Sequence, residues 1–531
     1  MAVILRTSRD VAPVLASDRA CRTPGTEAAL PAGTRPVADL AHRLEDAFGA
    51  IRDRWWTLGR KLGAEPTADI AHMPTCSTYG SDFGVMLAWG RVVADLARDT
   101  ETTLVVCDDP WLFRHLATLP GVAAGRAPAL VPIRIALCLR GVLARTRIAV
   151  RLARARLRLV RLRSIAPAGA PSLLVYGHPG SNAAGIDAFF GRLMLEVPAL
   201  IRLLHTDTGT AEALRLAPDG RTASLHGWGR LPWILALPFS RWRPRSGQDE
   251  PDRWLIRRAA DREGARGGGA MNRWQIRCQA AWLDDRRPAA IGWPWENHPW
   301  ERALSRQARA LGIRTIGFQH TVIGPHMFNQ SPATNWDGFD SLPDLILCNG
   351  PAYRDQLLAW GVPAGRLAIG GNLRLAEPGR LRHDPEGPIF VALSSDAGFS
   401  RQMLAAIEPL AEGGLTFLVK GHPLYPVTVT ETPRLRPTDR QLQDHDGLAG
   451  VIYCTGAVGL EALMGGLPTI RFLPEGAVAM DILPPGIRAV ATDAAGLAAA
   501  IAAMTPPPAM DPATILSPPD WNVWRQALKA A

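Results

Sequence analysis

The sequence has 531 residues, 47% of them hydrophobic and 20% charged, and 59 basic against 49 acidic side chains give a formal charge of +10. This length favours two or three domains, and the composition gives each one an ordinary apolar core, which excludes a disordered chain and a fibrous repeat.

The cysteines and the apolar runs indicate the compartment. The seven cysteines are scattered without a CxxC pair, which is typical of a reduced cytosolic protein and excludes a disulfide framework or a zinc site. The N-terminus lacks the apolar core of a signal peptide, and no apolar run approaches the ~20 residues of a membrane helix. We therefore expect a cytoplasmic protein that is soluble or peripheral on the inner face of the cytoplasmic membrane.

The net charge is concentrated in one segment. No acidic residue occurs between Asp109 and Asp187, and residues 133–163 contain ten arginines. On a helical wheel, one stripe carries Arg140, Arg147, Arg151, Arg154, Arg158 and Arg161, and another carries Leu152, Ala155, Leu159 and Leu162. A basic amphipathic helix of this kind is typical of helices that lie on anionic lipid, and a solvated helix without a partner is the alternative. The remainder of the chain is balanced in charge, which argues against a nucleic-acid partner.

Short apolar runs alternate with helical patterns along the whole chain, which predicts an α/β fold with parallel sheets. The clearest strand candidates are Thr103–Cys107, Ser172–Tyr176, Ala289–Gly292, Thr315–Phe318, Leu345–Cys348, Ile389–Leu393, Thr416–Lys420, Gly450–Tyr453 and Thr469–Phe472. Polar residues follow many of these strands. In open α/β sheets, ligands bind at that carboxyl edge.

The strand and helix pattern is interrupted at residues 329–343, where we expect an inter-domain crossing or an active-site loop. This places an N-terminal α/β domain at 1–335, a C-terminal α/β domain at 340–505, and a proline-rich linker with a last helix at 506–531. That linker is long enough for the last helix to fold back on the first domain. The stretch 262–270 (REGARGGGA) is predicted to be a flexible surface loop.

Two successive strands, near 290 and 316, are followed by groups suited to acid–base chemistry. Glu296 and His298 follow the first strand, and Gln319 and His320 follow the second. Glu296 or His298 is our candidate general base, with His320 lining the cleft. Trp293, Trp295 and Trp300 surround Glu296 and His298, and we interpret them as a wall of that cleft more than as a core plug. Asp109, after an earlier strand, is predicted to cap a helix.

The C-terminal domain carries a candidate nucleotide site. A strand ends in Lys420, and His422 and Pro423 follow it. About 30 residues later a second strand ends at the small residues Thr455 and Gly456, where backbone N–H groups and a helix start favour a phosphate. Glu461, within that helix, is placed to bond ribose hydroxyls, and Ser394 either lines the same pocket or caps a helix. These residues predict a site for a nucleotide-activated sugar.

Lys-x-His-Pro at 420–423 with Glu-Ala-x-x-x-Gly-x-Pro at 461–468 resembles the donor domain of GT-B glycosyltransferases. The resemblance is closest to the polysialyl- and Kdo-transferase-like branch of bacterial surface carbohydrate biosynthesis, whose Glu-Asn-x-Pro-Trp-Glu and Gly-x-Gln-His blocks are similar to residues 296–301 and 317–320. It implies two Rossmann-like domains facing each other across a cleft. In CMP-sugar members a Ser-rich turn holds the nucleotide, which implies a CMP-linked donor. This chain has Cys454-Thr455-Gly456 where two serines are expected.

The resemblance implies transfer of a sugar from a nucleotide-activated donor to a hydroxyl of a growing surface polysaccharide or lipid-linked glycan. We expect no metal and no cofactor beyond the nucleotide-sugar co-substrate. Three alternatives remain open at this stage. They are a glycerol- or ribitol-phosphate transferase, a non-hydrolysing sugar-nucleotide epimerase on the same fold, and a non-catalytic membrane-associated assembly protein.

Overall fold

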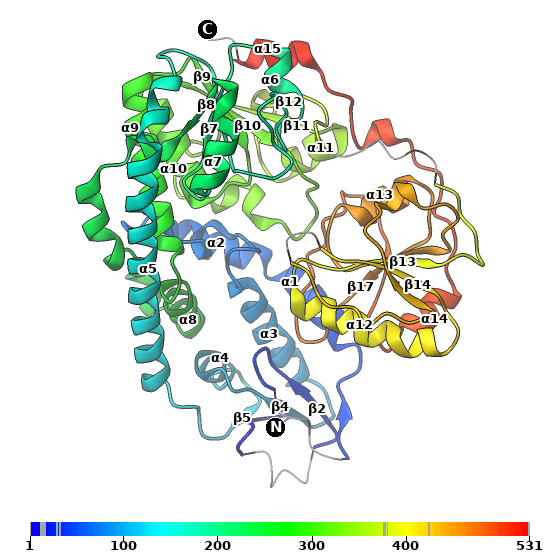
Figure 1. Ribbon diagram of the computed structural model, residues 1–531. Helices are drawn as coiled ribbons and strands as arrows, with labels where there is room; N and C mark the ends of the chain where they lie inside the picture. The colour runs from blue at the N-terminus through cyan, green and yellow to red at the C-terminus, as the bar shows by residue number, and fades with distance from the viewer. Residues whose placement is uncertain are drawn as a thin grey trace.

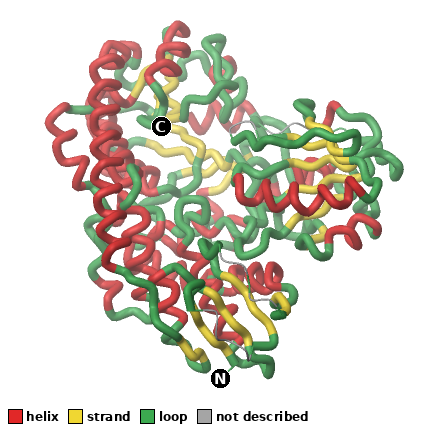
Figure 2. Tube along the Cα trace, turned by 60° about the horizontal axis from the view of Figure 1, so that its bottom comes forward, coloured by secondary structure: helices red, strands yellow, loops and turns green. Residues whose placement is uncertain are grey.

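The computed structural model describes residues 2–10, 17–27, 30, 33–374, 379, 381–422 and 425–528. This part of the chain forms three parallel sheets flanked by helices, and the strands stand in three separate groups in Figure 2. The second and third sheets confirm the predicted α/β class with two Rossmann-like parallel sheets. The first sheet is an addition that the sequence analysis did not predict as a separate unit.

The first sheet has five strands in the order β3-β2-β4-β1-β5. Their bounds are β1 Val3–Arg6, β2 Arg19–Arg22, β3 Arg35–Pro36, β4 Thr103–Val106 and β5 Val122–Ala124. The helices of this region are α1 Leu40–Ala50, α2 Arg52–Gly63, α3 Phe83–Leu96 and α4 Pro110–Leu116. Asp109 caps α4 by accepting hydrogen bonds from the backbone of Trp111 and Leu112, as predicted.

The second sheet has seven strands in the order β12-β11-β10-β9-β6-β7-β8. Their bounds are β6 Ser172–Val175, β7 Ile201–Leu204, β8 Thr222–Ser224, β9 Ala290–Pro294, β10 Arg314–Gln319, β11 Leu345–Cys348 and β12 Leu367–Ile369. The connecting helices are α6 Leu193–Glu196, α7 Thr210–Leu216, α8 Arg253–Gly264, α9 Gly268–Arg286, α10 Pro299–Ala310 and α11 Pro351–Ala359. The central strands are buried along their whole length, because helices cover both faces of a parallel sheet.

The third sheet has six strands in the order β15-β14-β13-β16-β17-β18 and forms a separate lobe in Figure 1. Its strands are β13 Ile389–Ala392, β14 Phe417–Lys420, β15 Leu435–Pro437, β16 Gly450–Tyr453, β17 Thr469–Phe472 and β18 Val490–Thr492. Its helices are α12 Ala397–Glu412, α13 Val458–Met464 and α14 Leu497–Ala502. The lobe has its own apolar core, formed by residues such as Val391, Ile407 and Ile452.

The change from one sheet to the next lies later in the chain than the expected boundary at 335–340. Strands β11 and β12 continue the seven-stranded sheet beyond β10, and the six-stranded sheet begins only at Ile389. The irregular residues 329–343 belong to the same lobe as β10. Asn329, Thr334 and Asn335 are buried there, so the polar composition of this stretch reflects buried hydrogen bonding.

The end of the chain returns to the seven-stranded sheet, as the length of the linker allows. Helix α15 (Trp521–Leu528) places Trp524 against Phe190 and Phe318, and the Trp524 indole N–H donates to the Gly370 carbonyl. The connection before it runs beside the sheet, where Ser517 N–H donates to the Asn349 carbonyl.

The arginine-rich segment forms one long helix, α5 (Val131–Leu159), along one side of the molecule in Figure 1. Its apolar stripe is buried and its arginine stripe is exposed, which confirms the amphipathic pattern. The predicted flexible loop at 262–270 was wrong. Helices α8 and α9 leave only three residues between them, and Ala265 and Ala270 are buried.

Candidate functional site

The seven-stranded sheet has one position where the direction of strand order reverses. The chain runs outward from β6 to β7 and β8 on one side, then returns to β9 beside β6 and runs outward to β12 on the other. Ligands bind in such sheets beyond the carboxyl ends at this switch point. The loops that emerge there carry His178 after β6 and Glu296 and His298 after β9, with His320 after the neighbouring β10.

The structure brings three of the predicted residues together at this edge. His298 Nε2 lies 2.6 Å from Glu296 Oε2, and His320 Nε2 lies 3.6 Å from Glu296 Oε1. Asn297, between the two hydrogen-bonded residues, has a left-handed backbone with φ of 57°. Asn adopts this conformation more readily than most non-glycine residues, so it suits the tight turn between Glu296 and His298. We name Glu296, His298 and His320 the acid–imidazole cluster.

The charges of the acid–imidazole cluster fix its protonation. Enclosure alone opposes a charge on Glu296, but the His298 hydrogen bond and the nearby His298 and His320 rings outweigh it and lower the pKa of Glu296 to about 2. Burial opposes a charge on His298 too, yet the bond to Glu296 raises the pKa of His298 above its usual value. Burial lowers the pKa of His320 to about 4. At neutral pH the cluster therefore holds the ionised carboxylate of Glu296, the imidazole of His298 with its raised pKa, and the neutral imidazole of His320.

A buried frame holds the acid–imidazole cluster in place. Glu301 accepts hydrogen bonds from the Trp293 indole and from the backbone N–H groups of Glu296 and Asn297, at 3.0, 2.9 and 2.9 Å. Burial and the charge of Glu296 raise the pKa of Glu301 to about 7 even though His298 opposes this. The Asn297 side chain donates to the Asn329 carbonyl at 2.7 Å. The polar stretch at 329–343 thus supports the loop that carries the cluster.

The interpretation of the three tryptophans as a cleft wall was wrong. Trp293 and Trp295 are at most 1% exposed and Trp300 is 3% exposed, so they belong to the core. Trp293 and Trp300 use their indole N–H groups on Glu301 and on the Tyr176 hydroxyl. They act on the site by fixing the residues behind it.

The six-stranded sheet has its own switch point, between β13 and β16. The chain passes from β13 outward to β15, then returns to β16 on the other side of β13. Ser394 follows β13 and Thr455 follows β16. Ala392 pairs in register with Lys420 of β14 and with Tyr453 of β16, so these three strand ends lie side by side. The structure therefore brings Lys420, Ser394, Thr455 and Gly456 to one edge.

The other predicted donor-side residues lie around this edge. Glu461 on α13 accepts a hydrogen bond from Gln443 at 3.1 Å, and burial raises its pKa. Lys420 donates to the Asp439 carbonyl at 2.7 Å. The His422 ring lies 5.5 Å from that of Tyr425, and burial lowers the pKa of His422. Pro423 lies outside the described residues. Glu461 and Lys420 thus approach the 438–445 loop, whereas His422 sits with Tyr425.

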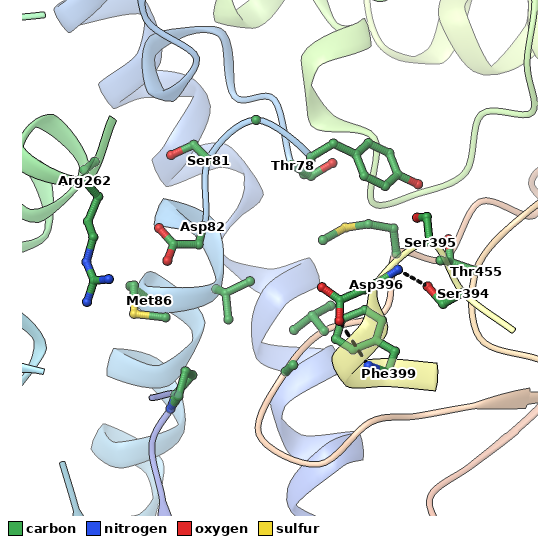
Figure 3. Close-up of a pocket in the computed structure, with 18 of the residues that line it drawn as sticks. Thr78, Ser81, Asp82, Met86, Arg262, Ser394, Ser395, Asp396, Phe399 and Thr455 are labelled. Carbon is green, nitrogen blue, oxygen red and sulfur yellow. Dashed lines mark hydrogen bonds between the residues drawn. The ribbon is translucent and has the colours of Figure 1, made fainter. Parts of the chain in front are cut away.

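A cavity of about 620 Å³ separates the two lobes (Figure 3). The six-stranded lobe contributes Ser394, Ser395, Asp396 and Thr455, and the N-terminal part contributes Ser81, Asp82 and Arg262. Asp396 caps α12 by accepting from Gly398 and Phe399, at 2.7 and 3.1 Å. Gly456 has a φ of 128° and open space where a Cβ would stand, so its backbone is accessible.

Tyr79 was missed by the sequence analysis, although it lines the cavity together with Thr455 of the six-stranded lobe. Burial and, to a smaller extent, the charge of Glu296 raise the pKa of Tyr79. Arg374 was missed as well. Its charge acts on Glu296 and His320, and its guanidinium lies 5.2 Å from the centre of the Phe189 ring. Neither residue belongs to a motif, and a large aromatic in a polar loop was the one available signal for Tyr79.

Among the described residues, no group of three or more His, Cys, Asp or Glu side chains is arranged to hold a metal ion. A search of the same residues finds no helix that is both long and apolar enough to cross a bilayer.

No protein-family model matches the chain. No curated protein matches it either. Among solved structures, the chain is similar to the glycotransferase of kitacinnamycin, at 14% identity and a TM-score of 0.37 over 68% of this chain and 95% of that one. It is also similar to Arabidopsis thaliana UGT89C1 complexed with quercetin, at 14% identity and a TM-score of 0.36 over 63% and 90%. A third match is UDP-GlcNAc 2-epimerase from Neisseria meningitidis bound to UDP-GlcNAc, at 12% identity and a TM-score of 0.30 over 56% and 81%. TM-scores below 0.5 at such identity do not identify an activity.

Proposed function

We propose that the protein is a GT-B glycosyltransferase that moves a sugar from a nucleotide-activated donor to a hydroxyl of an acceptor in the cleft between its lobes. One observation carries the proposal. The switch points of two parallel sheets both carry polar side chains, one with the acid–imidazole cluster and the other with a phosphate-compatible turn at Thr455 beside the cavity. Transfer needs a base on the acceptor side and stabilisation of a leaving phosphate on the donor side.

The donor occupies the edge of the six-stranded sheet. The exposed backbone at Thr455 and Gly456 receives the phosphate, and Lys420 stabilises its charge as the bond to the sugar breaks. Lys420 uses one of its three donors on Asp439, which leaves two for a ligand. Glu461 with Gln443 accepts the ribose hydroxyls, and Ser394 and His422 complete the edge. The motif resemblance favours CMP as the nucleotide.

The acceptor hydroxyl meets the Glu296–His298 pair. Glu296 keeps 34% of its side chain exposed, whereas His320 keeps 4%, so the carboxylate is the part of the acid–imidazole cluster that an acceptor contacts. A carboxylate with a pKa of about 2 is a weak base by itself, but its bonded imidazole has a raised pKa. The pair therefore acts as one base, and the hydroxyl proton ends on His298. The neutral His320 positions Glu296 from the other side.

The acceptor is a glycan hydroxyl of a growing surface polysaccharide or of a lipid-linked glycan, and the protein works at the inner face of the cytoplasmic membrane. Arg262 and Arg266 line the cleft on the acceptor side, together with Asp82 and Glu263.

A thermal-shift series with CMP, CDP, UDP and GDP tests the donor site. We expect one nucleotide to stabilise the protein, and Lys420→Ala to reduce that stabilisation. Lys61→Ala is the matched control, because Lys61 is exposed and pairs with Glu250 away from the cleft. If no nucleotide stabilises the protein, or if Lys420→Ala and Lys61→Ala behave alike, the proposal is wrong. Nucleotide release with and without acceptor then separates transfer from epimerisation, and release of CMP from a CDP-alditol identifies an alditol-phosphate transferase.

A further inference from the structure

Helix α5 begins with about one dozen residues that have almost no protein partner. Its first ten residues are exposed except Leu137, although the sequence there is VPIRIALCLR. Leu139 is 67% exposed, and Val131, Ile135 and Leu143 repeat at nearly the same four-residue spacing on the open side. A helix that is apolar on most sides is ordinarily buried. Here the described residues cover little of it: Leu137 is half-buried, and Arg134 pairs with Asp261.

A second apolar segment lies along α5. Arg156 donates to the Gly229 carbonyl and Arg145 donates to the Pro238 carbonyl, at 2.6 and 2.8 Å, so the chain from 229 to 238 runs antiparallel to the helix. Within it, the 3-10 segment η6 (Leu231–Phe239, LPWILALPF) exposes Leu235 at 79% and Phe239 at 70%. We name α5 and η6 together the α5–η6 surface. The two elements are in contact, and each exposes large apolar side chains.

The charge of the α5–η6 surface has one sign. Residues 131–165 contain no acidic side chain, and neither does the stretch 220–248 that contains η6. Acids from other elements reach three of the arginines. Arg134 pairs with Asp261, Arg151 with Asp207 at 3.5 Å, and Arg163 with Asp285. Arg140, Arg147, Arg154, Arg158 and Arg161 make no ion pair with any described residue. A shallow hollow there is lined by Thr210 and by four arginines, Arg147, Arg151, Arg154 and Arg158.

Exposed apolar side chains together with unpaired arginines distinguish two partners that could cover the α5–η6 surface, a second copy of the chain and an anionic bilayer. A second copy of the chain would bring the same unpaired arginines against each other, which like-charge repulsion disfavours. An anionic bilayer offers phosphates for the arginines and an apolar layer for the leucines and Phe239. The segments are surface-lying, because no described helix is suited to cross a membrane. Charge complementarity therefore selects an anionic lipid surface.

The α5–η6 surface also communicates with the cleft. A pocket of about 260 Å³ lies between Ser240–Trp242, at the end of η6, and Tyr79, and it is lined by Glu263 and Arg266 as well. Tyr79, Glu263 and Arg266 line the large cavity too. Helix α8 stands between the two, since Gly264 accepts from Arg145 of α5 while Arg262 faces the cavity. Only helix α8 therefore separates the α5–η6 surface from the cavity between the lobes.

We propose that the α5–η6 surface binds an anionic lipid bilayer, with Leu139, Leu235 and Phe239 in the interfacial layer and the unpaired arginines on lipid phosphates. Resting on the proposed function, the pocket between Trp242 and Tyr79 admits the head of an acceptor carried by that bilayer. The acceptor class is then a phosphate-linked glycan on a lipid.

Cys138 gives a direct probe, because it lies on α5 and is exposed whereas the other six cysteines are buried. The full chain, labelled there with a polarity-sensitive fluorophore, is mixed with vesicles of phosphatidylcholine alone or with 30% phosphatidylglycerol (about this fraction gives a strongly anionic surface). We expect a blue shift and co-sedimentation with the anionic vesicles only, both weakened by salt. No blue shift, or equal binding to neutral vesicles, would overturn the proposal.

Two variants and two controls separate the contributions. Leu235→Ser with Phe239→Ser removes the apolar contact, and changing Arg147, Arg151, Arg154 and Arg158 to Gln removes four charges. Each is expected to lower vesicle affinity at least about tenfold, given about 1 kcal/mol per basic residue near an anionic surface. Val490→Ser and the fourfold Gln variant of Arg35, Arg98, Arg354 and Arg382 make the same exchanges on other exposed sites and should bind normally.

Sedimentation velocity without vesicles tests whether a second copy of the chain covers the α5–η6 surface instead. A dimer that Leu235→Ser with Phe239→Ser converts to monomer would assign the patch to a second copy and refute the lipid proposal. Vesicle binding requires no transfer activity and nucleotide stabilisation requires no vesicle. Failure of the lipid proposal is therefore distinguishable from failure of the proposed function.

Discussion

At the edge of the seven-stranded sheet the candidate side chains bond to one another, whereas at the edge of the six-stranded sheet Lys420 and Ser394 bond to the backbone and Glu461 bonds to Gln443. Glu296, His298 and His320 form a contiguous cluster backed by Glu301. Lys420 and Ser394 instead bond to the backbone of Asp439 and Asp396. The first edge is organised before any ligand binds. The second keeps donors and acceptors for a ligand to use.

The largest effect should come from breaking the organised edge. Glu296→Gln keeps the size of the side chain but removes the negative charge that the rings of His298 and His320 both approach. We expect the rate of sugar transfer to fall about 10²–10⁴-fold, which is the usual contribution of a general base. Nucleotide affinity, measured by titration calorimetry, should stay unchanged because Glu296 lies on the other lobe. Glu412→Gln, at the exposed end of α12, is the control. A loss of nucleotide affinity in Glu296→Gln would contradict the assignment of nucleotide binding to the other lobe alone.

The matching change at the second edge is Glu461→Ala. It removes the carboxylate that Gln443 holds toward the proposed ribose site. We expect nucleotide affinity to fall about ten- to a hundredfold, as for one or two hydrogen bonds to a charged group. At saturating donor the transfer rate should recover. A rate that stays low at saturation would assign Glu461 to the chemical step.

The pH dependence sharpens the comparison further. The Glu296–His298 pair is a base only when His298 is unprotonated, and the pKa of His298 is raised above 6.5. The transfer rate should therefore rise about tenfold per pH unit at low pH and level off above the raised pKa. His298→Gln should remove this dependence. Nucleotide affinity should not follow the same curve, and a shared inflection would contradict the assignment of the base.

The smallest effect is expected from Tyr79, which lines the cavity together with Thr455. Tyr79→Phe removes only the hydroxyl, which we expect to hydrogen-bond to Thr455 across that cavity. We expect a reduction of about fivefold in transfer efficiency, which corresponds to one neutral hydrogen bond. Thr455→Val should give a similar loss, and the double variant should lose little more, since both changes remove the same contact. Full additivity would show that the two residues act separately.

The sequence predicted half of the strands, and it missed the interior strands β1, β2 and β7 as well as the edge strands. All nine proposed strands exist, because long β-branched runs in parallel sheets are buried on both faces. The edge strands β5, β8 and β18 have three residues each and give no comparable signal. Residues 329–343 were misplaced because buried polar side chains resemble a surface loop in composition. Trp293 was misread because alternation along a strand does not reveal that both sheet faces are covered.

For the candidate site, the sequence could locate strand ends but not the contacts between distant segments. Glu296 and His298 are two residues apart, so their pairing was within reach of motif reasoning. Tyr79 lies more than 370 residues from Thr455, and only the packing of the two lobes brings both to one cavity. Arg374 follows β12 in a stretch that the sequence analysis had assigned to the other domain.

The return of α15 to the seven-stranded sheet has a consequence for synthesis. Trp524 is fully buried against Phe190 and Phe318, so a helix at the very end of the chain covers a core whose strands begin at Ser172. Domains ordinarily fold as they leave the ribosome, the N-terminal ones first. Here the six-stranded lobe, although later in the chain, has its whole sequence available before the core of the seven-stranded sheet is closed. The six-stranded lobe can therefore fold before α15 arrives to close the core of the seven-stranded sheet.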